Sequence, residues 1–423
     1  MATTPDRILS LDVIRGIAVM GILSVNIVGM AMIENAYFFP PDYGFHSTGD
    51  RVMWALNSIF VDGRFRALFS ILFGASLTLV VERAIAAGKR GWKVHYARMI
   101  VLLGFGLLHF YVFWWGDILA NYAMVGMIAF LFWRLPLNWL LAAAFAALAV
   151  SYVPGFVETA DRLALFEASQ QPDATPQEKA QVRQMLEGMY SSPEALEADK
   201  REHGSLAAHI EAATQGPRAV EPFQGVLGYG IETLGLMLLG IAGFRTGFLT
   251  GAWSRKSYAR VAAVCLGGDL LVHAYAAYLS LQADFAPQVY FPWTRVYVSP
   301  LHPVGALGYA ALIILLFPHR GAIADRFAAV GRAAFTNYLG STLVGTLLFY
   351  GTFGGLYGEL SRGESWLIVP AVWALMLLWS KPWLERYRYG PFEWAWRSLS
   401  RWRWEPMRRS SPRPSPAPGS PAA

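Results

Sequence analysis

The chain has 423 residues, of which 55% are hydrophobic and 15% are charged, and its formal net charge is +6 at pH 7. A soluble protein usually carries about 25% charged residues, so the composition excludes a soluble globular protein as the simplest interpretation. The composition also excludes a disordered or collagen-like chain. A disulfide-stabilised chain is excluded because the sequence holds a single cysteine, Cys265. The class that fits is a polytopic, all-helical membrane protein.

Ten segments are apolar and long enough to cross a bilayer, which takes a helix of about 20 residues. In chain order these predicted spans are residues 8–33, 65–84, 96–115, 117–134, 136–156, 223–244, 257–281, 300–318, 328–351 and 365–383. The sequence therefore predicts an all-α membrane helix bundle of about ten transmembrane helices.

Basic residues predict the orientation of this bundle. With the N-terminus in the cytoplasm, most of the 35 lysines and arginines, Arg7 among them, fall on the cytoplasmic side, as the positive-inside rule requires. An even number of spans then places the C-terminus there too. We expect a multi-pass protein of the cytoplasmic (inner) membrane whose positive charge serves topology and contact with anionic lipids of the bilayer, not nucleic-acid binding.

Three segments lie outside the predicted spans, and one of them separates the spans into two groups. Residues 1–157 and 223–384 each hold about five spans, and the acidic residues 158–222 between them are expected to form an extracytoplasmic helical insert or a loop. Aromatic and basic residues interleave in 385–409, which predicts a cytoplasmic helix at the membrane interface. The Pro- and Ser-rich residues 410–423 are expected to be disordered.

Ionisable residues inside spans are candidate functional residues, because a charge is costly in a bilayer. Asp12 and Arg15 are three residues apart and share a face of the first span. They either form a structural ion pair or place Arg15 to bind a phosphate that enters from the cytoplasm. Arg332 and Asn337, at the inner end of the span 328–351, are candidates for the same phosphate contact or for a structural role.

Several polar residues fall at a similar depth in the predicted outer half of the bundle. Asp269 and His273 are four residues apart and therefore share a helix face. Each residue alone is more readily structural than functional, but together they favour a water-accessible cavity, or alternatively the proton relay of a transporter. Their spacing gives little support to a metal site, so no metal is expected. The residues at this depth are His46, His109, Asp117, Glu232, Asp269 and His273.

At these positions the sequence resembles the YeiB-like bacterial membrane proteins, a family whose domain is one of unknown function. The matching blocks follow one another along nearly the whole chain. They are Asp12-Val-Ile-Arg15-Gly16, Gly21 to Asn26, Phe69 to Gly74, Gly106 to His109, Gly116 to Tyr122, Glu232 to Gly240, Gly331 to Tyr338 and Gly390 to Arg397. This family is related to the transmembrane acyltransferases, which include heparan-alpha-glucosaminide N-acetyltransferase.

The resemblance implies a bundle that takes an acyl (acetyl) group from cytoplasmic acyl-CoA and passes it to a hydroxyl or amine of an extracytoplasmic glycan. By position it implies that His46 is the catalytic base and that Asn26 contacts the acyl carbonyl. Arg15 and Asp12 would hold the phosphates of the co-substrate, acetyl-CoA or another acyl-CoA. We expect substrate contacts from the outer polar residues His109, Asp117, Glu232, Asp269 and His273.

Two other functions are consistent with the same residues. A transporter or exporter of a small polar or lipid-linked solute would use the polar residues as its path, although the sequence shows no pair of related halves. A non-catalytic membrane scaffold would bind a partner through residues 158–222 or through the aromatic-basic segment 385–409.

Overall fold

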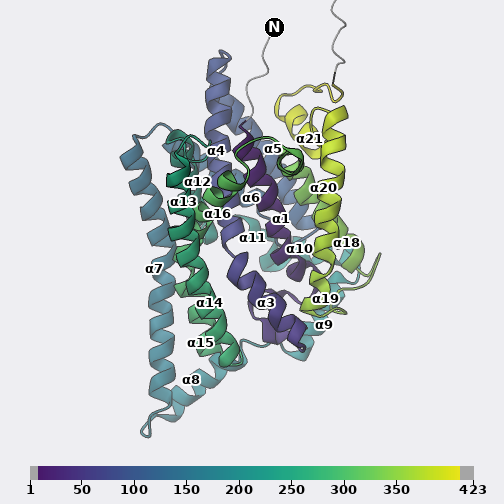
Figure 1. The fold of residues 1–423 in the computed structure, drawn as a ribbon. Coiled ribbons are helices and arrows are strands. Elements are labelled where there is room, and N and C mark those ends of the chain that lie inside the picture. The colour runs from purple at the N-terminus through teal and green to yellow at the C-terminus, as the bar shows by residue number, and fades with distance from the viewer. Residues whose placement is uncertain (1–7, 410–423) are drawn as a thin grey trace, which may run out of the picture.

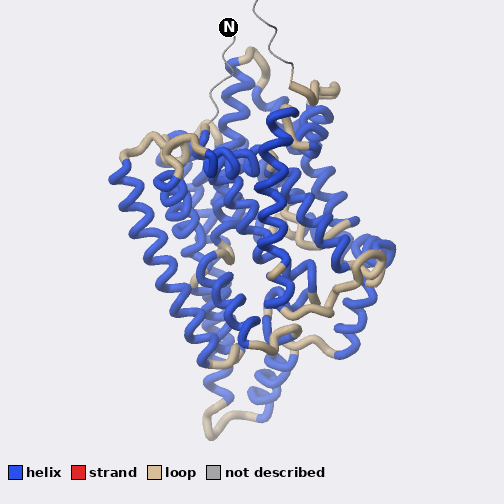
Figure 2. Tube along the Cα trace, turned by 45° about the vertical axis from the view of Figure 1, so that its right-hand side comes forward, coloured by secondary structure: helices blue, strands red, loops and turns tan. Residues whose placement is uncertain are grey.

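The computed structural model describes residues 8–409, which form helices and connecting loops (Figure 2). Within this range the sole β-type contact is the isolated bridge between Tyr387 and Arg408. Arg7 and the tail 410–423, which was predicted to be disordered, lie outside the described residues. The prediction of an all-helical chain is confirmed.

The main helices of the bundle come from both halves of the chain. In the first half they are α1 (Leu9–Ala31), α3 (Thr48–Phe60), α4 (Arg64–Ala86), α5 (Gly91–Val112), α6 (Leu119–Ala129) and α7 (Leu137–Ser169). In the second half they are α12 (Tyr229–Arg245), α13 (Arg255–Val261), α14 (Gly267–Gln282), α16 (His302–Leu316), α17 (Ala322–Arg332), α18 (Ala334–Phe349), α19 (Arg362–Trp366) and α20 (Ile368–Arg386).

Shorter helices connect these elements or lie at the two ends of the bundle. The π-helical turn Ala262–Leu266 joins α13 to α14, and a second π-helical turn, Pro292–Tyr297, follows α15. The shorter helices are α2 (Glu34–Phe38), α8 (Pro176–Glu187), α9 (Pro193–His203), α10 (Leu206–Thr214), α11 (Glu221–Gln224), α15 (Pro287–Phe291) and α21 (Pro391–Ser400).

The helices run between two ends of the molecule (Figure 1). We call the upper end in that view the terminal end, because α1 begins there and α21 lies there. We call the opposite end the insert end, because it carries α8 and α9, which belong to the predicted insert 158–222. The first twelve residues of that segment, 158–169, instead continue α7, which ends only at Ser169.

Eight helical segments, rather than ten, are long and apolar enough to cross a membrane within the described range. The predicted span 117–134 corresponds to the shorter apolar helix Leu119–Phe132. The predicted span 328–351 is two helices, α17 and α18, because the backbone leaves helical geometry at Ala333 (φ −107°, ψ 28°). Neither segment therefore reaches the length of the other eight.

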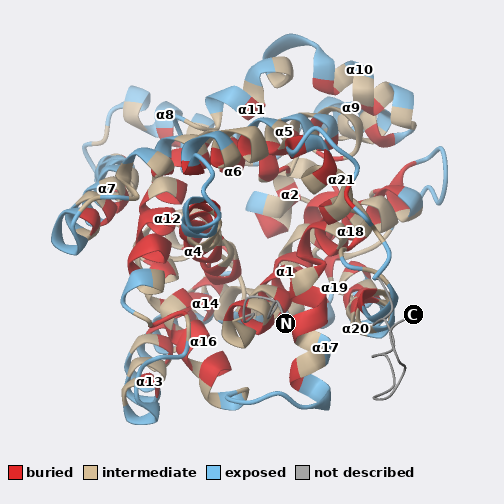
Figure 3. Ribbon diagram, turned by 90° about the horizontal axis from the view of Figure 1, so that it is seen from above, coloured by how far each residue is buried: buried red, intermediate tan, exposed pale blue. Residues whose placement is uncertain are grey.

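The first helix, α1, occupies the centre of the bundle. In its apolar window 78% of the residues are buried, against 17% for α7. Figure 3 accordingly shows α1 as largely buried in the middle of the molecule and α7 at its edge. Side chains on α1 can therefore contact several other helices at once, and α7 has the wide exposed apolar surface of a helix at the bundle periphery.

Glycines let the central helices touch backbone to backbone. A Cβ atom on Gly16 of α1 would lie 2.1 Å from the carbonyl oxygen of Phe327 on α17. A Cβ atom on Gly331 of α17 would lie 1.8 Å from the carbonyl oxygen of Asp12 on α1. Small residues at helix crossings are a common device of membrane bundles, where close packing drives association. The crossing of α1 and α17 consequently depends on these two glycines.

Replacing Gly331 by alanine tests this contact. The added methyl group would force the two backbones apart, and we expect the unfolding free energy to fall by about 1–3 kcal/mol, the usual cost of overpacking. The readout is the midpoint of thermal unfolding in detergent. The control is Gly340→Ala in α18, where an added Cβ meets no atom within 4 Å. Equal midpoints for the two variants would contradict the close crossing.

Candidate functional site

A pocket of about 280 Å³ lies near the terminal end, among α1, α4, α5, α6, α17, α18 and α21. Its most distinctive feature is its charge, because six arginines line it together with two carboxylates, those of Asp12 and Glu393. We call it the arginine pocket. Its arginines are Arg15, Arg83, Arg98, Arg332, Arg388 and Arg397.

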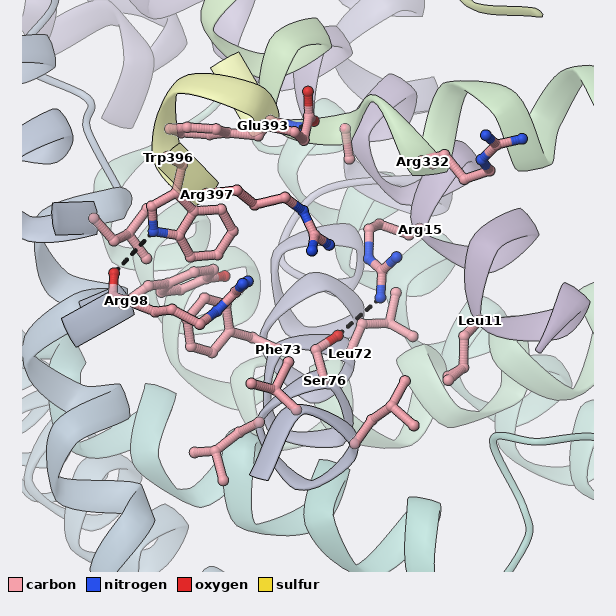
Figure 4. Close-up of a pocket in the computed structure, with 18 of the residues that line it drawn as sticks. Leu11, Arg15, Leu72, Phe73, Ser76, Arg98, Arg332, Glu393, Trp396 and Arg397 are labelled. Carbon is pink, nitrogen blue, oxygen red and sulfur yellow. Dashed lines mark hydrogen bonds between the residues drawn. The ribbon is translucent and has the colours of Figure 1, made fainter. Parts of the chain in front are cut away.

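The central helix supplies Arg15 to this pocket. Its guanidinium group donates a hydrogen bond to Ser76 Oγ on α4 at 2.8 Å. A second, longer contact of 3.3 Å joins it to Asp12 Oδ1, one helical turn earlier on α1. Figure 4 shows the hydrogen bond to Ser76. Both partners hold the charged end of Arg15, so its position is set before any ligand arrives.

The C-terminal helix α21 forms the opposite wall. The indole N–H of Trp396 donates to the backbone oxygen of Arg98 on α5 at 2.8 Å. The guanidinium carbon of Arg98 lies 4.1 Å from the centre of the Trp396 ring, and that of Arg397 lies 4.7 Å from the ring of Tyr389. Figure 4 shows the charged ends of Arg15, Arg98 and Arg397 directed into the same space.

The buried carboxylate of Glu393 anchors α21 to the bundle. One of its oxygens, Oε1, accepts the backbone N–H groups of Phe335 and Thr336 at 2.7 and 3.1 Å, at the start of α18. The other, Oε2, accepts the Thr336 hydroxyl at 2.5 Å. Burial raises the pKa of Glu393, although these hydrogen bonds act in the opposite direction. The same contacts account for the break at Ala333, since they satisfy the first N–H groups of a new helix.

Apolar side chains complete the pocket. Figure 4 shows Leu11, Leu72 and Phe73 on one side of the arginines. Aromatic rings of Tyr122 and Phe335 line it as well. A cavity with guanidinium groups beside an apolar wall suits a ligand that combines anionic groups with an apolar chain, because guanidinium binds phosphate or carboxylate in bidentate fashion.

Of the four residues predicted to contact a cofactor, three line this pocket: Asp12, Arg15 and Arg332. The fourth, Asn337, does not. Its amide group donates to the Val330 backbone oxygen at 3.1 Å and to Ser380 Oγ at 3.2 Å, and its oxygen accepts the Trp379 indole N–H at 2.9 Å. Asn337 thus joins α18 to α20.

Arg15, Asn26 and His46, to which the resemblance gives parts in one reaction, do not line one pocket in the structure. Asn26 lines a second pocket, of about 110 Å³, which it shares with Arg66. His46 is exposed on the loop before α3 and lines neither pocket, and its backbone N–H donates to Asp50 Oδ2 at 3.0 Å. The three residues therefore have three different surroundings.

His109 and Asp117 form one buried pair. Nδ1 of His109 lies 2.8 Å from Asp117 Oδ1, and its Nε2 lies 3.0 Å from the Thr342 hydroxyl on α18. Asp117 Oδ2 also accepts the backbone N–H of Ala120 at the start of α6. These contacts tie α5, α6 and α18 together, and neither side chain lines the arginine pocket.

The other buried carboxylates pair with arginines that the sequence analysis did not single out. Glu232 Oε2 accepts from Arg66 at 2.8 Å, and Asp269 Oδ2 accepts from Arg64 at 2.7 Å. His273 lies 3.2 Å from the other oxygen of Asp269. A signal was present in the sequence, because two buried acids require counter-charges and both arginines stand at the start of the predicted span 65–84. The outer polar residues thus belong to separate hydrogen-bonded groups.

Replacing Asp269 by alanine tests how much this buried pairing contributes. Arg64 and Asp269 are both fully buried, so the loss of one partner leaves an uncompensated charge and should cost about 3–5 kcal/mol. The control is Asp284→Ala, because Asp284 pairs with Arg51 at 2.6 Å but its side chain is 79% exposed. We expect about 1 kcal/mol or less there. Similar drops in unfolding midpoint for both variants would contradict a structural role for the buried pair.

Comparison with known proteins gives matches over most of the chain. Residues 243–403 match the family described as "Protein of unknown function (DUF418)". The chain is 32% identical over 403 residues to the uncharacterized protein YeiB of Escherichia coli K12, covering 93% of this chain and 96% of that protein. It is 29% identical over 422 residues to the uncharacterized protein YxaH of Bacillus subtilis 168, covering 96% and 98%.

Proposed function

This chain belongs to the DUF418 family of YeiB-like multi-pass membrane proteins, and we propose that it binds an acyl-CoA in the arginine pocket and transfers the acyl group to an extracytoplasmic glycan. The observation that carries the proposal is the lining of that pocket, which contains six arginines and two carboxylates beside an apolar wall. A cavity lined by more arginines than carboxylates has a positive potential, which favours an anionic ligand.

The orientation follows from the distribution of basic residues. Arg83, Lys89, Arg90 and Lys93 surround the junction of α4 and α5 at the terminal end. By the positive-inside rule this end faces the cytoplasm, so the arginine pocket opens towards the compartment that holds acyl-CoA, and both termini are cytoplasmic.

Green fluorescent protein fused to Ala423 tests this orientation, and the fusion should fluoresce. A fusion that is present in the membrane but does not fluoresce would contradict the orientation.

Acyl-CoA has the chemistry that the pocket lining favours. Its diphosphate and ribose phosphate would be held by guanidinium groups such as those of Arg98, Arg397 and Arg15, which present paired N–H donors. Its apolar parts would lie along Leu72 and Phe73. Arg15 is already held by Asp12 and Ser76, so little side-chain freedom is lost when the phosphate binds.

The transfer step uses the residues that the family resemblance implies. The acceptor hydroxyl or amine attacks the thioester carbonyl, the carbon–sulfur bond breaks, His46 takes the acceptor proton, and the CoA thiolate leaves and is protonated by water. Asn26, eleven residues after Arg15 on α1 and about 16 Å further along it, would donate to the carbonyl oxygen. His46 lies outside both pockets, so its part in the step needs a test of its own.

Neutralising single pocket arginines tests the binding step. We expect Arg98→Gln and Arg397→Gln each to weaken acetyl-CoA binding by about 10–100-fold, the value of a charge-assisted hydrogen bond. Isothermal titration calorimetry of the purified chain in detergent gives the dissociation constants. The matched control is Arg90→Gln, an exposed arginine at the same end. Unchanged affinity in both pocket variants would contradict acyl-CoA binding at this place.

His46→Ala separates binding from transfer. Because His46 is exposed and distant from the arginine pocket, we expect its replacement to leave the acetyl-CoA dissociation constant unchanged. Release of free CoA from acetyl-CoA, followed with a thiol reagent in the presence of a glycan acceptor, should fall by about 10²–10⁴-fold, the contribution of a general base. Wild-type rates in His46→Ala would remove His46 from the mechanism and leave the binding proposal standing.

A second candidate is a transporter or exporter of a phosphorylated, lipid-linked solute. The arginine pocket favours it too, because its guanidinium groups and apolar wall suit any phosphorylated amphiphile. Flux of such a solute through proteoliposomes without an acyl donor, lost in Arg98→Gln, would decide for the transporter.

A further inference from the structure

A polar cluster at the insert end takes no part in the proposed acyl transfer. It consists of Glu202 and His203 at the end of α9 and His209 on α10. Each of these side chains offers one ligand atom, and the three atoms lie within 4.8 Å of one another. His203 and His209 are 2% and 0% exposed, so the cluster is enclosed between the insert and the bundle.

The ring nitrogens in this cluster are unusual for buried polar atoms. Among the described residues, Nε2 of His203 and both ring nitrogens of His209 have no hydrogen-bond partner. His209 Nδ1 lies 3.3 Å from Glu202 Oε1, but the contact does not have the geometry of a hydrogen bond. A buried polar atom without a partner costs about 1–3 kcal/mol. Nε2 of His203 and one nitrogen of His209 can be satisfied together by a ligand that lies between the two rings and Glu202.

His203 is oriented so that Nε2 is its free ring nitrogen. Its Nδ1–H donates to the backbone oxygen of Asp199 at 3.0 Å and lies 3.1 Å from Asp199 Oδ1. Tyr357 donates its hydroxyl to the same carboxylate oxygen at 2.6 Å, and its ring stacks on His203 with the centroids 3.8 Å apart. A carboxylate that holds the second nitrogen of a histidine is the usual support of a metal ligand.

The charges around the cluster also favour a cation. Three carboxylates gather here, those of Glu34, Asp199 and Glu202. Within residues 8–409 the arginine that pairs with them is Arg218, which bridges Glu202 and Glu34. A positive ion would therefore enter a surplus of negative charge.

We propose that Glu202, His203 and His209 bind a divalent metal ion. Imidazole nitrogen with carboxylate oxygen is the donor set of zinc sites, and three protein ligands leave a position for water. The ion would join α9 to α10. It would also hold the insert on the bundle, because the backbone N–H of Gly351, after α18, donates to the His203 backbone oxygen at 3.0 Å.

Zinc binding by the purified full chain tests the site. The protein carries an affinity tag without histidine, is treated with EDTA, incubated with zinc chloride, passed through gel filtration and analysed by elemental mass spectrometry. We expect one bound zinc per chain for the wild type and for His319→Asn, an exposed histidine that serves as the matched control. His209→Asn and Glu202→Gln should lose it, and Asp199→Asn, a positioning residue, should lower the affinity about 10–100-fold.

Thermal unfolding distinguishes a variant that has lost the metal site from one that has failed to fold. Zinc should raise the unfolding midpoint of the EDTA-treated wild type and of His319→Asn, and it should leave Glu202→Gln, which keeps the side-chain volume, unchanged. A wild-type chain that retains no stoichiometric zinc overturns the proposal. So does equal zinc retention by the wild type and by folded Glu202→Gln or His209→Asn.

Discussion

The backbone contact between α1 and α17 is the constraint on which the arginine pocket depends. At this crossing there is no room for a side chain at Gly16 or Gly331. Arg15 directly precedes Gly16 on α1, Arg332 directly follows Gly331 on α17, and both arginines line the pocket. The residues that permit the close approach and those that carry the charge are thus neighbours in the chain. Close packing in a membrane bundle, which relies on small residues, here also determines where the positive charges gather.

Charge balance distinguishes the two halves of the bundle. In the buried network away from the pocket, Arg64 is paired with Asp269 and Arg66 with Glu232, so these charges are neutralised within the protein and hold helices together. In the arginine pocket the guanidinium groups outnumber the carboxylates, and Glu393 is occupied with the N–H groups of α18. In the first arrangement each arginine pairs with a carboxylate of the protein, whereas in the second the arginines outnumber the carboxylates that line the pocket, which is why we propose that an anion binds there.

The sequence predicted what depends on local pattern, and it did not predict what depends on contacts between distant segments. The helical composition and the apolar length of the spans follow from local pattern, and so does the shared face of Asp12 and Arg15 on the first span. The central position of α1 does not, because it depends on packing against other helices. The helix break at Ala333 could not be read from 328–351, because it depends on Glu393 far along the chain. For the same reason the sequence predicted a helix in 385–409 but not its contact with α5, through which α21 supplies a pocket wall. Conversely, similar depth along separate helices did not bring the outer polar residues into one group, since depth leaves the facing direction of each helix undetermined.

The central claim is that the anionic part of acyl-CoA occupies the space between α1, α5 and α21. Photo-crosslinking with an azido-adenine derivative of CoA in membranes that contain the full chain tests it most directly, with the modified peptides identified by mass spectrometry. We expect labelling of peptides around Arg98 and Trp396–Arg397, abolished by excess unlabelled CoA. Labelling confined to peptides of the insert end, or labelling that excess CoA does not reduce, would contradict it.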